Sequence, residues 1–249
     1  MKLRGGYIMS RKKLVIIIAE GSEQDALYPN LKKFGEKLNI QFKIMGTDVF
    51  TAEENNKKSS KAIIGDIIRE VTSRPEINKK DIKLVIQLTD TDGVYISNDK
   101  IVVDTYQSEK TTYTFESIRV NSQDQLKRIE KRNYKKRMHL NTLAKTEKIL
   151  SIVTYKILYF SRNLDHVISN KPDTPNLEKS RKADAFSDSF ATPNDFEKFF
   201  TKSDFTVNGT YDETWDFIKE EAKSLERFSN FHFIFEMLKE IKLENEGFL

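Results

Sequence analysis

The sequence predicts an α/β protein, with a mainly parallel sheet flanked by helices and a helical C-terminal region. Two continuous apolar runs of strand length, KLVIIIA at Lys13–Ala19 and KLVIQL within Asp81–Thr89, are typical of strands buried on both faces. Segments with apolar residues at helical spacing separate these runs, and this alternation indicates a parallel sheet with crossover helices. From Asn176 onward the pattern is helical.

The N-terminal part alternates in the order β-α-β-α-β, for which right-handed crossovers are expected. Ser22 is a suitable cap for the first helix, and Pro75 stops the second because proline lacks a backbone donor. The expected elements are the strand Lys13–Ala19, a helix ending at Asn39, the strand Gln41–Met45, a polar loop over Gly46–Lys58, the helix Ser59–Ser73 and the strand Asp81–Thr89.

The following segment is expected to hold shorter strands and a long basic helix. The expected elements are a hairpin of Val94–Ile96 with Ile101–Val103, a strand within Thr111–Val120, a helix from Ser122 to about Leu150, the strand Tyr155–Phe160 and the helix Asn163–Ser169. The loop Lys171–Pro175 carries two prolines. It separates a core of residues 13–170, which includes the basic segment 122–150, from a helical region of residues 171–249.

Two amphipathic helices are expected in the C-terminal region, over Asp212–Phe228 and Phe231–Lys242. Trp215 and the phenylalanines of this region are expected to lie in a core or at a protein interface.

Composition excludes several classes of site. The 249 residues, of which 38% are hydrophobic, are enough to bury a core. Cysteine is absent, which excludes disulfides, thiolate metal sites and a cysteine nucleophile. No apolar run approaches the roughly 20 residues that cross a bilayer, and no secretory signal is recognised, so we expect a cytoplasmic protein without a membrane partner.

Three carboxylates follow the two buried strands. Glu20 comes directly after the first, and Asp90 and Asp92 come at the end of the other. Residues i and i+2 at a strand exit point the same way, and the carboxyl ends of parallel strands form the edge where sites are built. Hard oxygen ligands favour Mg²⁺ or Mn²⁺ over zinc. Carboxylates around such an ion suit metal-assisted cleavage of phosphodiesters.

The two motifs resemble those of the Toprim family. IIIAEGSEQ at Ile16–Gln24 is similar to the first Toprim motif, a strand followed by Glu-Gly and a helix. QLTDTDG at Gln87–Gly93 is similar to the second, a strand followed by Asp-x-Asp. The resemblance covers roughly Lys13–Phe160 and implies a Toprim-like (Rossmann-like) fold. Glu23 matches the extended first motif of the OLD-like and RloB-like branches, which implies a bacterial anti-phage defence nuclease.

The resemblance also implies roles for particular residues. Glu20 would bind metal or act as a general acid/base, Asp90 and Asp92 would hold the metal, and Glu23 would serve a second ion. A later acid and a lysine often complete the site in OLD-like enzymes. The candidates here are Asp165 for the acid and Lys179 or Lys182 for the lysine.

A basic segment indicates contact with nucleic acid. Lys127–Lys148 contains nine basic residues against two glutamates. This excess exceeds ordinary pairing along a helix and suits sequence-independent binding to phosphates, with Tyr134 as a candidate for base stacking. The residues chosen as nucleic-acid contacts are Lys131, Arg132, Lys135, Lys136 and Arg137.

Other interpretations of the same residues stay open. Alone, Glu20 is also an ordinary helix-start carboxylate, and Asp90 and Asp92 are also ordinary turn residues. His166 is also interpreted as a polar residue on a short helix, and His232 as a core histidine.

Two other functions also remain. Asp90-Thr91-Asp92-Gly93-Val94 fits the first motif of haloacid dehalogenase-like phosphatases, in which the first aspartate is the nucleophile. The other alternative is that the chain is a non-catalytic partner subunit of a defence complex. No P-loop is present, so any ATPase partner would be a separate chain. The sequence does not decide whether the substrate is DNA or RNA. It also leaves open whether the chain forms a homo-oligomer.

Overall fold

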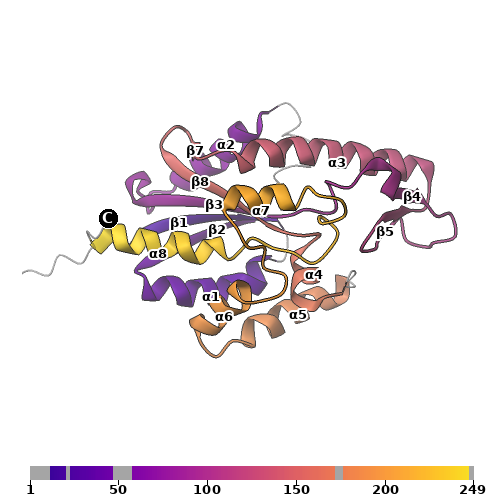
Figure 1. Cartoon of the computed structure of the whole chain (residues 1–249). Coiled ribbons are helices and arrows are strands. Elements are labelled where there is room, and N and C mark those ends of the chain that lie inside the picture. Colours follow the sequence, from indigo (N-terminus) through magenta and orange to yellow (C-terminus); the bar gives the residue numbers. More distant parts are fainter. Residues whose placement is uncertain (1–11, 21–22, 47–57, 172–175, 247–249) are drawn as a thin grey trace, which may run out of the picture.

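A five-stranded sheet lies at the centre of the molecule (Figure 1). The computed structural model describes residues 12–20, 23–46, 58–171 and 176–246. The strand order is β2-β1-β3-β8-β7, in which the first four strands are parallel and β7 is antiparallel to β8. The strands are β1 (Lys13–Ala19), β2 (Ile40–Gly46), β3 (Ile82–Asp90), β7 (Lys148–Ile149) and β8 (Val153–Phe160). The predicted α/β class with a mainly parallel sheet is therefore confirmed.

Helices cover both faces of this sheet, because the side chains of its strands alternate between two hydrophobic cores. Val15 and Ile17 of β1 enter one core, and Ile16 and Ile18 enter the other. The first core is covered by α1 (Glu23–Lys37), α4 (Leu164–Ser169), α5 (Asn176–Asp188), α6 (Pro193–Thr201) and α8 (Phe233–Glu246). The second is covered by α2 (Ser60–Thr72), α3 (Gln123–Ala144) and α7 (Tyr211–Phe217).

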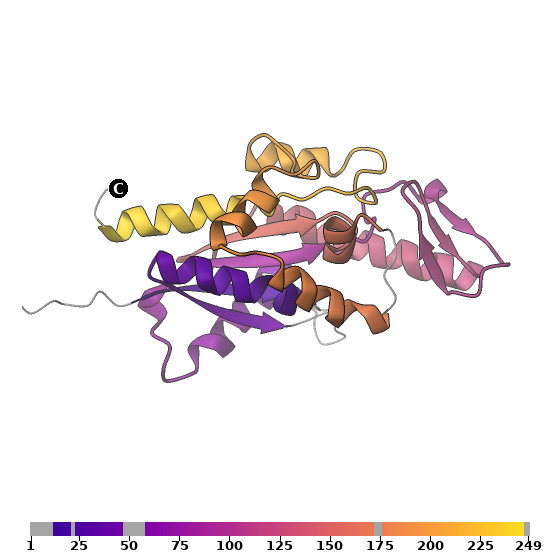
Figure 2. The same ribbon diagram turned by 90° about the horizontal axis from the view of Figure 1, so that it is seen from below.

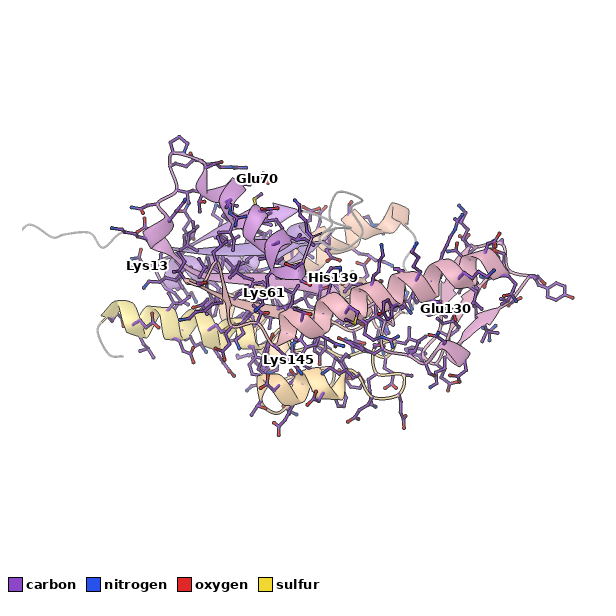
Figure 3. All side chains as sticks on the ribbon, turned by 90° about the horizontal axis from the view of Figure 1, so that it is seen from above. Lys13, Lys61, Glu70, Glu130, His139 and Lys145 are labelled. Carbon is purple, nitrogen blue, oxygen red and sulfur yellow. The ribbon has the colours of Figure 1, made fainter. Side chains whose placement is uncertain are left out.

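The figures show these layers from two further directions. From below, α1, α5 and α6 lie in front of the sheet (Figure 2). From above, Glu130, His139 and Lys145 mark the course of α3, and Lys61 and Glu70 mark α2 (Figure 3). The two helices are joined by a hydrogen bond of 2.8 Å between Ser60 Oγ and His139 Nδ1.

The first predicted elements agree closely with the structure. β1 has the predicted bounds, and α2 begins directly after its cap Ser59, whose hydroxyl accepts a hydrogen bond from the Ala62 N–H. Asn39, predicted to end the first helix, adopts a left-handed φ of 57°. The predicted cap Ser22 and residues 47–57 of the predicted loop lie outside the described residues.

The predicted hairpin of Val94–Ile96 with Ile101–Val103 is wrong. Residues 94–96 form turns, Asn98–Lys100 is a short 3₁₀ helix, and β4 (Ile101–Val103) instead pairs in parallel with β6 (Ile118–Val120). The strand predicted within Thr111–Val120 is two strands, because a turn separates β5 (Thr111–Tyr113) from β6. These strands form a second sheet in the order β4-β6-β5. It packs against the first turns of α3 through Leu126 and Ile129.

The long basic helix ends earlier than predicted. α3 stops at Ala144, and the residues up to Leu150 include the edge strand β7. Leu150 and Ser151 have φ values of 51° and 63°, so the chain reverses there and returns as β8. A second short 3₁₀ helix, Lys79–Asp81, leads into β3.

The C-terminal helices share the first core of the sheet. Phe196, Phe200, Phe231 and Phe235 are all buried in the same cluster as Val15. These four phenylalanines are therefore core residues, as is Trp215, which is buried in the second core.

The two C-terminal helix predictions differ in their outcome. The helix predicted over Asp212–Phe228 ends at Phe217, and turns follow it. The one predicted over Phe231–Lys242 is α8, displaced by a few residues. Across the described ranges, no helix combines the length and apolar character needed to cross a membrane.

Candidate active site

The predicted carboxylates lie where the sheet changes direction of winding. From the end of β1 the chain crosses to β2 on one side, and from the end of β3 it goes on to β8 on the other side, so the connections leave these two neighbouring strands in opposite directions. Ligands of open α/β sheets bind outside the carboxyl ends of the strands at such a point. Glu20 follows the last residue of β1, and Asp90 is the last residue of β3. The fold therefore brings the two motifs to neighbouring strand ends.

A buried lysine joins the two motifs. The ammonium of Lys136, on α3, lies 2.7 Å from Asp92 Oδ2 and 3.6 Å from Glu20 Oε2. The Lys136 side chain is 6% exposed, against 20% for Glu20 and 30% for Asp92. Water and ligands therefore reach the carboxylates more easily than they reach the lysine.

The mutual charges outweigh the effect of burial on these groups. Burial alone would lower the pKa of Lys136, but Asp92 and then Glu20 raise it well above its usual value. Burial alone would raise the pKa of Asp92, but the charges of Lys136, Arg132 and Arg162 lower it below its usual value. Lys136 is therefore a cation and Asp92 an anion at neutral pH.

The loop after β3 is held in one conformation by backbone contacts. Asp92 has a left-handed φ of 49°, which aspartate tolerates better than most residues. Its N–H donates to Arg162 O at 2.9 Å, and the Thr91 hydroxyl donates to Ser224 O at 2.8 Å. Gly93 has a φ of 69°, and a Cβ there would lie 2.5 Å from Leu225 Cδ2. Glycine is thus required on two grounds, and the Asp92 carboxylate is fixed in place.

Asp90 is held from the other side by the start of α4. Its Oδ1 accepts a hydrogen bond of 3.1 Å from the Leu164 N–H. The cap of α4 is Asn163, whose side chain accepts from the His166 N–H at 2.8 Å. Asp165, the predicted later acid, is half-buried in the first turn of this helix and so lies next to the residue that binds Asp90.

Two arginines and a tyrosine support Asp92. Arg132 donates to the Asp92 carbonyl oxygen at 2.9 Å and to the Tyr113 hydroxyl at 2.8 Å. The guanidinium of Arg162 stacks over the Tyr113 ring at 4.6 Å from its centroid. Tyr113 belongs to β5, so the small sheet is attached directly to the site.

The donor set suits a hard cation. Within the described residues, no group of three or more His, Asp or Glu side chains is gathered closely enough to hold a metal ion. The Lys136 ammonium contacts both Glu20 and Asp92, and both carboxylates are more exposed than the lysine. Carboxylate oxygens are the ligands that Mg²⁺ and Mn²⁺ prefer, so the residues present fit such an ion.

The predicted basic contacts divide into two groups. Arg132, Lys136 and Arg137 are turned inward, and Arg137 donates to Val94 O at 2.9 Å. Lys131 and Lys135 are exposed. The exposed group presents its charge to solvent, whereas the inner group is directed at Asp92 and at backbone carbonyls.

Three predicted candidates lie on helices of the other face of the sheet. Glu23 is the first residue of α1, and its side chain lies outside the described residues, as does that of Lys179. Lys182 is half-buried on α5, which packs against α1 and α4.

The sequence interpretation did not find the roles of Lys136, Arg132, Tyr113 and Arg162 at the carboxylates. A signal existed for Arg162, because it follows β8 at the same edge of the sheet as Asp90. A signal also existed for the α3 pair, because Arg132 and Lys136 are spaced one helical turn apart. No sequence signal connects Tyr113 to the site.

No family model, no curated protein and no solved structure matches this chain.

Proposed function

We propose that this protein is a Mg²⁺-dependent Toprim-type nuclease that hydrolyses phosphodiester bonds of nucleic acid. The observation that supports it most directly is the convergence of Glu20 and Asp92, from two different strand ends, on the single charge of Lys136. A role as an anti-phage effector, with or without a separately encoded ATPase, belongs to the same proposal and rests on the motif resemblance.

Glu20, Asp90 and Asp92 would hold a Mg²⁺ or Mn²⁺ ion, with Glu23 available for a second. Such an ion polarises a phosphate and lowers the pKa of a bound water. The motif resemblance also assigns Glu20 the role of a general acid/base; its Oε2 lies 3.6 Å from Lys136 Nζ and its side chain is 20% exposed, so water reaches it.

Lys136 has a separate task at the phosphate. Because its pKa is raised, it stays protonated and does not act as the acid of the reaction. Its charge stabilises the negative charge that develops on the phosphate. Lys136 is thus the lysine that the contacts support, whereas Asp165 and Lys182 rest on the resemblance alone.

The outer face of α3 supplies the attraction for a polymer. Lys127, Arg128 and Lys131 are exposed, and across the described residues no carboxylate pairs with them. Arg128 stands one turn before Arg132 in the row that continues to Lys136. A phosphate backbone bound along this face would therefore lead to the carboxylates.

The test is cleavage of plasmid DNA, single-stranded DNA and bulk tRNA with Mg²⁺, Mn²⁺ or EDTA. We expect metal-dependent cutting that falls about 100-fold or more in Glu20→Ala and in Asp90→Ala. The matched control is Glu220→Ala, an exposed carboxylate after α7, which should cut like the wild type. Cutting that survives both site variants contradicts the proposal.

The same panel separates the alternatives. A phosphatase would release phosphate from p-nitrophenyl phosphate and leave the polymers intact. A non-catalytic subunit would do neither with any metal.

A further inference from the structure

The turn between β5 and β6 holds one exposed aromatic residue in a fixed place. Phe115 is 46% exposed although it is a large apolar side chain. The Thr114 Oγ1 accepts hydrogen bonds from the N–H of Glu116 at 3.2 Å and of Ser117 at 2.9 Å. In addition, the Thr114 N–H donates to Ser117 O at 2.9 Å. The exposed ring is therefore presented by a tight turn rather than by a loose loop.

This turn lies beside the candidate active site. Tyr113, two residues before Phe115, is bonded to Arg132, which binds the Asp92 carbonyl. On its other side, the Phe115 ring contacts the His166 ring, with centroids 5.6 Å apart. His166 lies two residues after Leu164, whose N–H binds Asp90. The turn thus spans from the support of one aspartate to the support of the other.

Phe115 projects from a polar turn and lies beside an uncharged histidine. Its neighbours in the turn are Thr114, Glu116 and Ser117, which are all polar. His166 is fully buried, and neither ring nitrogen has a hydrogen-bond partner among the described residues. Burial, then the charges of Arg162 and Arg227, lower the pKa of His166 to about 4, so the ring beside Phe115 is uncharged at neutral pH.

We propose that Phe115 stacks on an unpaired base next to the carboxylates, and that the ligand of this site is single-stranded nucleic acid. This inference rests on the proposed function and specifies its substrate class. A flat aromatic ring binds the face of any base, but a paired base inside a duplex does not offer that face. The outward cations of α3, Lys127, Arg128 and Lys131, bind the phosphates of the same strand.

The experiment measures binding without cleavage. Fluorescein-labelled oligothymidylate, oligouridylate and a duplex of equal length are titrated with the full chain in EDTA, and anisotropy gives each Kd. For Phe115→Ala we expect the Kd for both single strands to rise about 10-fold or more, with the duplex unchanged. Phe115→Trp should bind single strands like the wild type, because it keeps a stacking ring.

The matched control is Tyr106→Ala. Tyr106 is 98% exposed and follows Asp104, whose N–H donates to Val120 O, at the end of β6 away from the turn. The proposal is overturned by any of three results. These are equal effects of Phe115→Ala and Tyr106→Ala, a loss by Phe115→Trp as large as that by Phe115→Ala, or no binding of single strands.

Binding and cleavage fail separately. If Phe115→Ala changes nothing while the wild type still cuts with Mg²⁺, the nuclease proposal stands and the stacking proposal is wrong. If single strands bind through Phe115 but nothing is cut with any metal, the stacking proposal stands and the nuclease proposal is wrong.

Discussion

The two faces of α3 carry the same residue types in different states. On the inner face, Arg132 and Lys136 bind Asp92, and Arg137 binds the Val94 carbonyl. On the outer face, Lys127 and Lys131 are exposed and, within the described residues, pair with no carboxylate. One helix thus neutralises the site on one side and stays charged toward solvent on the other.

The difference teaches that a basic segment is not one functional unit. A charge that is buried against a carboxylate fixes the position of that carboxylate, and removing one partner of the ion pair destabilises the fold. A charge in water contributes little to stability but attracts a polyanion over a long range. The faces therefore predict opposite sensitivities, because inner substitutions change stability and outer ones change binding to nucleic acid.

The largest effect is expected from Lys136→Met, which keeps the length of the side chain and removes its charge. Glu20 and Asp92 would then repel each other without compensation. We expect a loss of about 2–3 kcal/mol in the free energy of unfolding, below the value for a fully buried pair because water reaches Asp92. Urea unfolding followed by circular dichroism measures it.

The matched control on the outer face is Lys131→Met. Lys131 is exposed and unpaired within the described part of the chain. The free energy of unfolding of the variant should therefore stay within about 0.5 kcal/mol of the wild-type value. Equal losses in the two variants would remove the distinction between the faces. Added Mg²⁺ should raise the melting temperature of Lys136→Met, because the ion replaces the missing charge.

The sequence predicts most of the sheet because its signals are local. β1 is a run of β-branched residues that must be buried on both faces, and its bounds follow from that run. The second sheet lacks such a signal. β4 and β6 have three residues each. They are neighbours in the sheet and pair in parallel, but β5 lies between them in the sequence, so neither periodicity nor turn chemistry marks them.

The candidate site is likewise predicted only in part. Glu20, Asp90 and Asp92 come from a rule about strand ends, which needs no side-chain contacts. The Lys136–Asp92 contact joins residues 44 positions apart, and its recognition requires the angle of α3 against the sheet. Buried Ile129 and Leu140 mark the inner face of α3 and offered a means of dividing its basic residues.

A smaller effect is expected for the pH dependence of the inner contact. Because the folded pKa of Asp92 is lowered from 3.8, its contribution is fully present above that value. It is lost as the pH falls through the lower folded pKa. Asp92→Asn should therefore lower the free energy of unfolding by about 1–2 kcal/mol near neutral pH.

The measurement is urea unfolding of wild type and Asp92→Asn from about pH 7 to about pH 3. The difference between the two should shrink as the solution is acidified. A constant difference across this range would mean that the Asp92 charge does not stabilise the fold. Asp216→Asn, in an exposed ion pair with Lys219, serves as the control and should differ little from the wild type at any pH.

The outer face predicts the smallest change, which appears in the salt dependence of binding rather than in stability. Replacing Lys127, Arg128 and Lys131 together by Gln removes three phosphate contacts in the proposed complex. The slope of log Kd against log salt for a single strand should fall by about 2, since each contact contributes about 0.7. Arg137→Gln, on the inner face, should leave the slope unchanged. A slope that changes with Arg137 but not with the outer triple would place the polyanion on the other side of α3.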